Sequence, residues 1–310
     1  MKIAVFGTGG IAQKAYFPLL LTMPDMEIVS VFSRTQASCD QAKTQWGFDN
    51  TTMDIQAVLD KKPQAAFVIS STESHYDICR RLLENGVDVY SEKALTSSSA
   101  QSFELGNLAE KMGRILAVGF NRRYALLYLQ AKEIFGSRRI QSALIQKHRT
   151  KMNYNRLFQQ YLDDSIHQID LARFFCGELE PCSTFVDKRD GKISGAVSLL
   201  NIPGGGLATI LTSNAAGAWQ ESVTLHGDGI SVHIDAFQQL TVKDEEHEVV
   251  YGNDRAGKWI RDLRERGFEG EIRHFLDCVQ SRQTPLTSAE EAAKTQVLLE
   301  ELVRLSGEEI

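Results

Sequence analysis

Two short segments carry side chains that suit proton transfer at a substrate oxygen. Lys93 follows Glu92 after an apolar run, and a positioned ammonium group can stabilise negative charge that develops on oxygen. Asp163 and His167 are four residues apart, so a helix places them on one face. Histidine can act as a general acid or base near neutral pH, and a nearby carboxylate can orient it. The pattern predicts a catalytic set of Lys93, Asp163 and His167.

Both segments also fit roles without catalysis. A lysine after a glutamate, as at Lys93, is typical of a solvated charge, and acidic residues such as Asp163 favour the start of a helix. Carboxylates and histidine can also bind a metal ion, but no second cluster in the sequence supplies obvious further ligands. We therefore expect no metal site, and neighbouring motifs must decide between catalysis and a solvated surface.

A glycine-rich loop lies at the start of the chain. The segment Gly7-Thr8-Gly9-Gly10-Ile11-Ala12 has the form G-x-G-x-x-A, and it joins a strand-like run, Lys2–Phe6, to a helix-like run, Ile11–Leu21. Such loops bring free backbone N–H groups and a helix N-terminus to a pyrophosphate. The alternative is a glycine-rich turn without a ligand. Cofactor contacts are predicted from Gly7, Thr8, Gly9, Gly10, Ile11 and Ala12.

The end of the second strand-like run, Glu27–Phe32, indicates the type of cofactor. NAD sites usually have an acidic residue there, which accepts a hydrogen bond from the ribose 2′-hydroxyl. This chain has Ser33 and Arg34 instead, which suit a 2′-phosphate. A solvated Arg34 is the alternative. The sequence favours NADP(H) over NAD(H).

Polar residues follow two further strand-like runs, Ala65–Ser70 and Val87–Tyr90. Ligands of open parallel sheets bind beyond the carboxyl ends of the strands. Further cofactor contacts are therefore expected from Ser71, Thr72, His75, Glu92 and Lys93. Ser74 is also a fair helix N-cap, so this loop has a structural alternative. Candidate substrate contacts are Asn121 and Arg123, which otherwise face solvent.

The elements that must position these residues change character near Gly119. Before it, short apolar strands alternate with helices, which predicts a parallel sheet covered on both faces. After it, alternating strands such as Ile230–Asp235 predict a largely antiparallel sheet, followed by helices near Glu271–Val279 and Glu290–Leu305. We therefore expect an α/β fold with a dinucleotide-binding domain over 1–120 and a substrate-binding and dimerisation domain over 121–310.

Composition limits the partners. The 310 residues carry a net charge of -6, which argues against nucleic acid or an anionic membrane as the main partner. The five cysteines are far apart in the sequence, so a reducing compartment fits best. No signal peptide and no apolar run of roughly 20 residues is found. The sequence predicts a cytoplasmic protein without a membrane span.

Taken together, these motifs resemble the Gfo/Idh/MocA oxidoreductase family over essentially the whole chain. The glycine loop stands where that family has its dinucleotide loop. Glu92-Lys93-Ala94 stands for its Glu-Lys-Pro, and Asp163-x-Ser165-x-His167-x-x-Asp170 for its Asp-x-Gly-x-His-x-x-Asp. The segments from Gly119 to Arg123 and from Arg266 to Phe268 are similar to the MviM-like branch. That branch often carries the label virulence factor, which states no chemistry.

The resemblance implies a Rossmann domain and a second α/β domain with an open, mostly antiparallel sheet whose outer face often forms a homodimer or homotetramer. It implies sugars, polyols or related hydroxy compounds as substrates. Lys93 would bind the reacting oxygen, His167 would be the general acid/base, and Asp163 would fix the geometry of substrate and histidine. Ala94 departs from the family proline. Since a non-proline cis bond costs roughly 2.5–4 kcal/mol, we expect a trans peptide there.

Three functions follow from these observations. The first is an NAD(P)-dependent oxidoreductase that acts on CH–OH groups with NADP(H) or NAD(H). The second is a non-catalytic regulatory sensor that binds the dinucleotide without hydride transfer. The third is a non-redox lyase, epimerase or glycosidase that uses a tightly bound NAD(P) transiently. The joint presence of the glycine loop, Lys93 and the Asp163–His167 pair favours the first.

Overall fold

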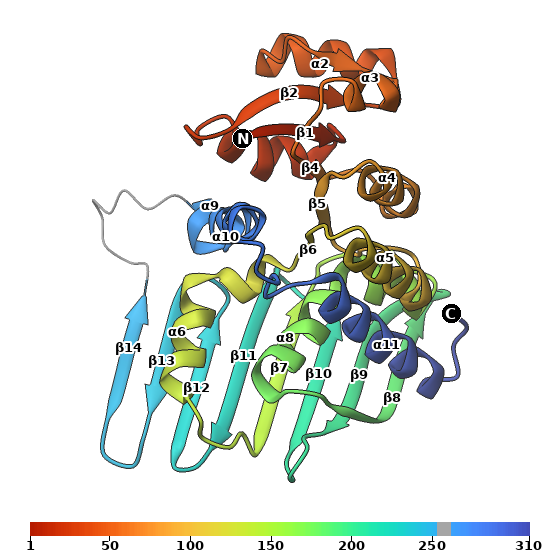
Figure 1. Ribbon diagram of the computed structural model, residues 1–310. Helices are drawn as coiled ribbons and strands as arrows, with labels where there is room; N and C mark the ends of the chain where they lie inside the picture. The colour runs from red at the N-terminus through yellow and green to blue at the C-terminus, as the bar shows by residue number, and fades with distance from the viewer. Residues whose placement is uncertain (253–261) are drawn as a thin grey trace. The chain divides into compact units, whose positions relative to one another are not determined.

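The computed structural model describes residues 1–252 and 262–310, which form two compact units (Figure 1). The first contains Met1–Phe120 and Phe268–Ala293, and the second contains Asn121–Gly267 and Lys294–Ile310. The change of pattern near Gly119 predicts a second domain that contains everything after residue 120. Phe268–Ala293 instead belongs with the first unit, because Phe275 packs edge-on against Phe67 at 5.4 Å between ring centroids.

The first unit is built on a six-stranded sheet in which all neighbours are parallel, in the order β3-β2-β1-β4-β5-β6. This is the strand order of a doubly wound dinucleotide-binding sheet, so the predicted Rossmann fold is confirmed. The strands are β1 (Lys2–Phe6), β2 (Glu27–Phe32), β3 (Thr51–Thr52), β4 (Ala65–Val68), β5 (Asp88–Glu92) and β6 (Leu116–Gly119).

Helical segments connect these strands, beginning with a π-helical turn, η1, after the glycine loop, and one further helix of the unit comes from much later in the chain. They are η1 (Ala12–Tyr16), α1 (Phe17–Leu20), α2 (Gln36–Trp46), α3 (Ile55–Leu59), α4 (Thr72–Glu84), α5 (Ser99–Lys111) and α10 (Phe268–Ser281). Apolar periodicity does not predict α2, because this helix buries only Cys39 and Ala42. Its start is fixed by Thr35, whose hydroxyl accepts a hydrogen bond from the Ser38 N–H at 3.2 Å.

The second unit contains an eight-stranded sheet in the order β14-β13-β12-β11-β7-β10-β9-β8. Only β7 and β10 pair in parallel, and the other neighbours are antiparallel, which confirms the mostly antiparallel sheet. The strands are β7 (Ser142–His148), β8 (Glu180–Arg189), β9 (Lys192–Asn201), β10 (Leu207–Ser213), β11 (Gln220–Gly227), β12 (Ile230–Asp235), β13 (Gln239–Lys243) and β14 (Glu248–Gly252).

Helices α6 and α8 lie against one face of this sheet (Figure 1). The helical elements of the unit are η2 (Asn121–Tyr124), α6 (Leu126–Phe135), α7 (Leu157–Gln160), η3 (Tyr161–Ser165), α8 (Ile166–Cys176) and α9 (Asp262–Glu265), and α11 (Ala289–Leu305) runs from the first unit into the second. Ser288 caps the start of α11, since its Oγ accepts a hydrogen bond from the Glu291 N–H at 3.3 Å. Within the described ranges, no helix is both long and apolar enough to cross a membrane.

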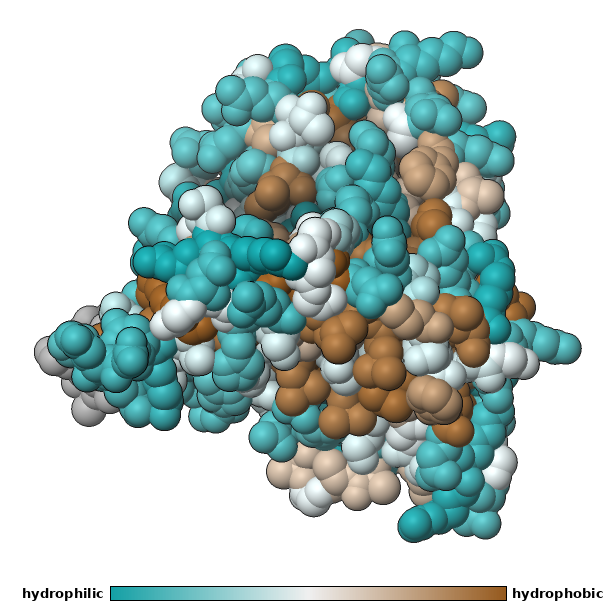
Figure 2. Space-filling view, turned by 90° about the horizontal axis from the view of Figure 1, so that it is seen from below, coloured by the Kyte–Doolittle hydropathy of each residue, from teal (hydrophilic) through white to brown (hydrophobic). Residues whose placement is uncertain are grey.

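The other face of the eight-stranded sheet carries exposed hydrophobic side chains on β8, β9 and β10. Phe185 is 62% exposed, Leu207 is 61% exposed and Leu199 is 38% exposed. Figure 2 shows a surface of the molecule on which hydrophobic side chains gather in one area. A monomer gains nothing from exposing large apolar side chains on neighbouring strands, so this face is suited to association.

Candidate active site

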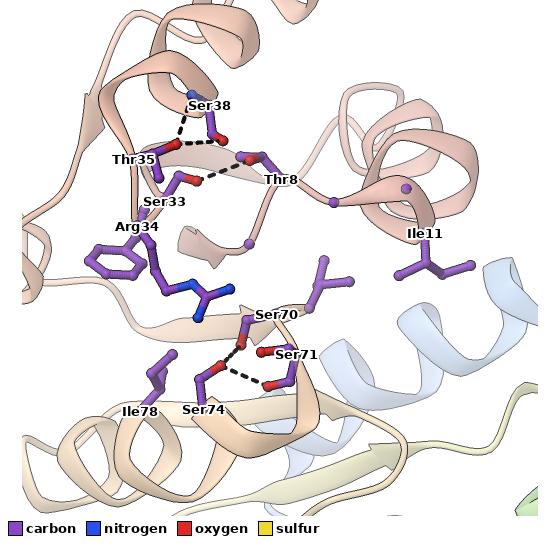
Figure 3. A pocket seen from close by; sticks show the side chains of 15 residues that line it. Thr8, Ile11, Ser33, Arg34, Thr35, Ser38, Ser70, Ser71, Ser74 and Ile78 are labelled. Atoms are coloured by element: carbon purple, nitrogen blue, oxygen red, sulfur yellow. Dashed lines mark hydrogen bonds between the residues drawn. The ribbon is translucent and has the colours of Figure 1, made fainter. Parts of the chain in front are cut away.

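The first unit contains a pocket of about 410 Å³ at the carboxyl ends of β1, β2 and β4 (Figure 3). This is the edge of the sheet at which doubly wound folds bind ligands. Eight of the predicted cofactor residues line it, namely Gly7, Thr8, Gly9, Gly10, Ile11, Ser33, Arg34 and Ser71. The pocket therefore brings together the glycine loop and the end of the second strand, as the motif predicts.

Glycine is required in this loop at Gly7. Its φ is +110°, and a Cβ atom there would lie 2.6 Å from the carbonyl oxygen of Ile69 on the neighbouring strand end. A Cβ on Gly9 or Gly10 would meet no atom within 4 Å, so these two glycines face open space. Gly7 thus shapes the turn, whereas Gly9 and Gly10 leave the backbone open to close approach by a ligand.

The opposite wall of the pocket holds the only formal charge among its described lining residues, the Arg34 guanidinium. Arg34 is exposed and extends into the pocket, with the Thr8–Ser33 pair on one side and Ser70 and Ser74 on the other (Figure 3). The Thr8 and Ser33 hydroxyls are 3.1 Å apart. A guanidinium next to hydroxyl donors fits an anionic group such as a ribose 2′-phosphate.

Several lining residues were missed by the sequence analysis. Ser70 and Ser74 face the pocket and are joined by a hydrogen bond of 2.8 Å, and Thr35 and Ser38 add two more hydroxyls. Serine and threonine runs after two strands were the available signal. The predicted cofactor residues that do not line this pocket are Ala12, Thr72, His75, Glu92 and Lys93.

A buried hydrogen-bond network holds the backbone at Lys93. The Glu92 carboxylate accepts a hydrogen bond from the Lys93 N–H at 2.9 Å through one oxygen and from the Tyr16 hydroxyl at 2.7 Å through the other. The Tyr16 and Tyr90 hydroxyls are 2.8 Å apart. Burial, reinforced by the charge of Glu92, raises the pKa of Tyr16 well above its usual value, so its hydroxyl stays a donor. The sequence does not reveal this role of Tyr16 and Tyr90, because a tyrosine in an apolar segment is typical of a hydrophobic core.

His75 fixes the other side of the same loop. It is buried, with Nδ1 2.9 Å from the Ala94 carbonyl oxygen and Nε2 3.0 Å from the Ser70 carbonyl oxygen. The ring therefore links the pocket wall at Ser70 to the Lys93 loop. The Lys93–Ala94 peptide bond is cis, so the expectation of a trans bond was wrong. A non-proline residue ordinarily favours the trans form. Here Glu92 binds the Lys93 N–H on one side of the bond, and His75 contacts the Ala94 carbonyl oxygen on the other.

In the second unit, Asp163 and His167 lie on one continuous helical segment formed by η3 and α8. Asp163 is exposed, whereas His167 is 8% exposed. The first part of the segment is π-helical, a geometry that often occurs at functional sites. Ser165, which stands where the related family has glycine, is fully buried inside this turn.

A buried charge cluster anchors Asp164, the residue next to Asp163. Lys147 Nζ donates to the Asp164 carbonyl oxygen at 2.6 Å and lies 2.9 Å from Oδ1, and Arg149 Nε donates to Oδ2 at 3.1 Å. Burial opposes ionisation of Asp164, but the hydrogen bonds from Arg149 and the charge of Lys147 outweigh it and hold its pKa at about 2. The cluster therefore fixes the π-helical turn that carries Asp163.

The pKa of Lys147 moves in the direction opposite to that expected for a simple ion pair. Burial, together with the positive charge of Arg122, lowers the pKa of Lys147 to about 8 despite the attraction of Asp164. Arg122 is itself fixed by Glu221, with Nη2 2.8 Å from Oε2. Burial is therefore the main reason why the pKa of Lys147 is low, and it acts although Lys147 Nζ lies 2.9 Å from Asp164 Oδ1.

The two predicted substrate contacts at the start of the second unit have protein partners. Arg123 makes a bidentate pair with Asp170, at 2.8 and 2.7 Å, and both side chains are buried. Asn121 Nδ2 donates to the Arg266 carbonyl oxygen at 2.8 Å.

Among residues 1–252 and 262–310, no three histidine, cysteine, aspartate or glutamate side chains are grouped as metal ligands. Lys93 lies in the first unit, and Asp163 and His167 lie in the second.

Comparisons with known proteins agree with the Rossmann fold of the first unit. The profile of a family described as "Oxidoreductase family, NAD-binding Rossmann fold" matches residues 1–120. YceM of Salmonella typhimurium, whose name assigns it provisionally to the oxidoreductases, is 31% identical over 98% of this chain and 97% of its own. The scyllo-inositol 2-dehydrogenase (NAD(+)) of Bacillus subtilis is 24% identical over 93% of this chain and 89% of its own. A crystal structure of the dehydrogenase MviM from Clostridium difficile has a TM-score of 0.90 at 29% identity, over 98% of this chain and 99% of the other.

Proposed function

The chain belongs to the Gfo/Idh/MocA family of NAD-binding oxidoreductases, and from this we propose that it transfers a hydride between NADP(H) and a hydroxyl- or carbonyl-bearing carbon of a sugar or polyol. The observation that carries the cofactor part is the pocket at Gly7, Ser33 and Arg34. The substrate class follows from relatives such as the scyllo-inositol 2-dehydrogenase of Bacillus subtilis.

We assign the chemistry to three side chains of the chain. Lys93 binds the reacting oxygen and stabilises the negative charge that develops on it. His167 takes the hydroxyl proton during oxidation and returns it during reduction. Asp163 orients the substrate and His167 on the η3–α8 segment. When bound, the nicotinamide supplies or accepts the hydride.

The remaining candidates have supporting roles in this proposal. Glu92 and His75 position the Lys93 loop through the contacts at Lys93 N and Ala94 O. We assign no substrate contact to Arg123, because its guanidinium is already bound by a buried carboxylate, Asp170. Asn121 anchors the backbone of Arg266.

The preference for NADP(H) over NAD(H) rests on Arg34. An NAD site places a carboxylate at the ribose 2′-hydroxyl, and the described residues that line this pocket include none. Arg34→Ala should weaken NADPH binding about tenfold to hundredfold, since a hydrogen bond to a charged group contributes roughly 1.5–3 kcal/mol. NADH binding should change little.

Fluorescence titrations of both reduced cofactors measure this preference. Arg80→Ala is a matched control, because Arg80 is an exposed arginine of the same unit that is not among the described residues lining the pocket. Equal weakening of NADPH and NADH by Arg34→Ala, or no weakening of either, would contradict the assignment.

We propose that the protein forms a homodimer or homotetramer through the outer face of the eight-stranded sheet. The exposed side chains of Phe185, Leu199 and Leu207 support this. Sedimentation velocity should show an oligomer for the wild type and smaller species for Phe185→Glu and Leu207→Glu. A wild type that sediments as a monomer would exclude this interface.

We further propose that the protein resides in the cytoplasm. Its five cysteines are free thiols and three of them are buried, as expected in a reducing compartment. Detection of the protein only in the secreted or membrane fraction of its cells would contradict this location.

A further inference from the structure

A second hollow, of about 380 Å³, lies in the second unit and is not used by the proposed reaction. Its walls come from the residue before β11, the β12–β13 turn and α9. Its polar and aromatic lining consists of Trp219, Phe237, Gln238, Asp262, Glu265 and Arg266. Arg266 belongs to one of the sequence segments that resemble the MviM-like branch.

The Arg266 wall of the hollow is fixed from several directions. The guanidinium stacks over the Phe237 ring at 4.9 Å, and its Nε donates to Asp262 at 2.7 Å. The Arg266 carbonyl oxygen accepts the hydrogen bond from Asn121. The next residue, Gly267, has a φ of +86° and lies so close to the Asn121 carbonyl that a side chain would not fit. This wall is therefore preorganised, and binding would cost little side-chain ordering.

The lining combines an aromatic face with donors and acceptors. Trp219 is 37% exposed, although large aromatic side chains are usually well covered. Asp262 and Glu265 supply acceptors, Arg266 supplies donors, and the Gln238 amide supplies both. A saccharide ring needs this combination, because its C–H face packs on an aromatic ring while its hydroxyl groups both donate and accept. A purely apolar ligand would remove water from these charged groups without offering them hydrogen bonds in its place.

The hollow lies at the same end of the sheet as the segment that carries Asp163. The register pairs Gln220, the first residue of β11, with His148, the last residue of β7. Trp219 directly precedes Gln220, and Arg149, which holds Asp164, directly follows His148. Neighbouring strands are about 4.8 Å apart, so Trp219 is separated from the Asp164 anchor by roughly one or two strand spacings.

The hollow also lies on the same face of the eight-stranded sheet as the segment that carries Asp163. Glu221 points to the helix-covered face, where it bonds Arg122. Phe237, which lines the hollow together with Trp219, packs against Tyr128 of α6 on that face, with 5.9 Å between the ring centroids. Lys147 of β7 faces the same side, where it bonds Asp164. A ligand on Trp219 and a ligand at Asp163 would therefore lie along one edge and on one face.

We propose that this hollow is an accessory site for a second saccharide ring, so that the preferred substrate is a glycoside or disaccharide rather than a free monosaccharide. The inference rests on the proposed function for the reacting ring, which is held at Asp163 and His167. Trp219 stacks against the second ring, and Asp262, Glu265 and Arg266 bind its hydroxyl groups.

Direct binding measurements on the full-length protein test this site without relying on turnover. D-glucose, maltose, cellobiose and lactose are titrated by calorimetry and by saturation-transfer NMR. At least one disaccharide should bind the wild type about tenfold tighter than glucose, and Trp219→Ala should remove most of that difference. Asp262→Asn, which keeps the size of the side chain, should weaken the same disaccharide. Phe103→Ala is the control, because Phe103 is also 37% exposed but belongs to the first unit.

The outcomes separate this site from the proposed reaction. If no disaccharide binds tighter than glucose, or if Trp219→Ala binds like the wild type, the accessory site is wrong even when monosaccharides are oxidised. If disaccharides bind through Trp219 but no hydride is transferred, the accessory site stands and the proposed reaction fails. Where turnover occurs, Trp219→Ala should raise KM for the glycoside about tenfold more than KM for the monosaccharide.

Discussion

Replacing Lys93 by methionine should lower kcat by about 10²- to 10⁴-fold, while NADP(H) still binds. The reason is that the ammonium group is the charge we assign to the reacting oxygen, and methionine keeps an unbranched chain without that charge. The backbone on both sides of this position is held by Glu92, which accepts from the Lys93 N–H, and by His75, whose Nδ1 lies 2.9 Å from the Ala94 carbonyl oxygen. The loop should therefore keep its shape in the variant.

Steady-state and single-turnover kinetics, with cofactor titrations beside them, measure the effect. Lys111→Met serves as a control, because Lys111 is an exposed lysine at the end of α5. A Lys93→Met enzyme with unchanged kcat would show that this lysine has no role in the reaction. A variant that loses cofactor binding would instead place Lys93 in the nucleotide site.

Replacing Asp164 by asparagine should lower the free energy of unfolding by about 3–5 kcal/mol, because it leaves the buried Lys147 ammonium without its counter-charge. Its neighbour Asp163 provides the comparison. Asp163 is exposed, so Asp163→Asn should reduce turnover but leave stability nearly unchanged. Urea unfolding and kinetics on both variants separate the two roles. A stable Asp164→Asn protein would contradict the buried cluster.

The cluster of Asp164 and Lys147 determines how the stability of the folded protein changes with pH. The pKa of Asp164 is about 2 in the folded protein and 3.8 ordinarily, so its contribution to stability is present above about pH 4 and is lost as pH falls toward 2. Lys147 has a folded pKa of about 8 against 10.5, so the unfolded chain binds more protons in that range and stability should rise from pH 8 to 10.5. The acid-side loss should be absent in Asp164→Asn.

The features that sequence predicted are those that local pattern determines. Local residue types predicted the glycine loop, the parallel first sheet and the Ser33–Arg34 wall of the pocket. Gly7 is an example, because its φ of +110° is a conformation that favours glycine. Most strands and helices followed from apolar periodicity. Helix α2 was missed because it buries only two small side chains and depends on its Thr35 cap.

The features that sequence missed depend on partners far along the chain. Nothing local distinguishes Asp163, which is exposed, from Asp164, which is bound by Lys147 and Arg149. Arg123 resembles a ligand contact until Asp170 is seen to bind it. The cis bond before Ala94 opposes local propensity, and the Ala94 carbonyl oxygen beside it is in contact with His75, which lies 19 residues earlier in the chain.

Transfer of deuterium from the cofactor tests the central claim most directly. The protein is incubated with NADPH deuterated at C4 of the nicotinamide and with carbonyl sugars and inosose-type ketones, and the products are analysed by mass spectrometry. The proposed oxidoreductase should place one deuterium on the product carbon and release NADP⁺ in equal amount. Product without deuterium and without net formation of NADP⁺ would indicate transient use of a retained cofactor. Binding of NADPH without conversion of any of these carbonyl compounds would indicate a sensor. Either result would contradict net hydride transfer to a substrate as the function of the protein.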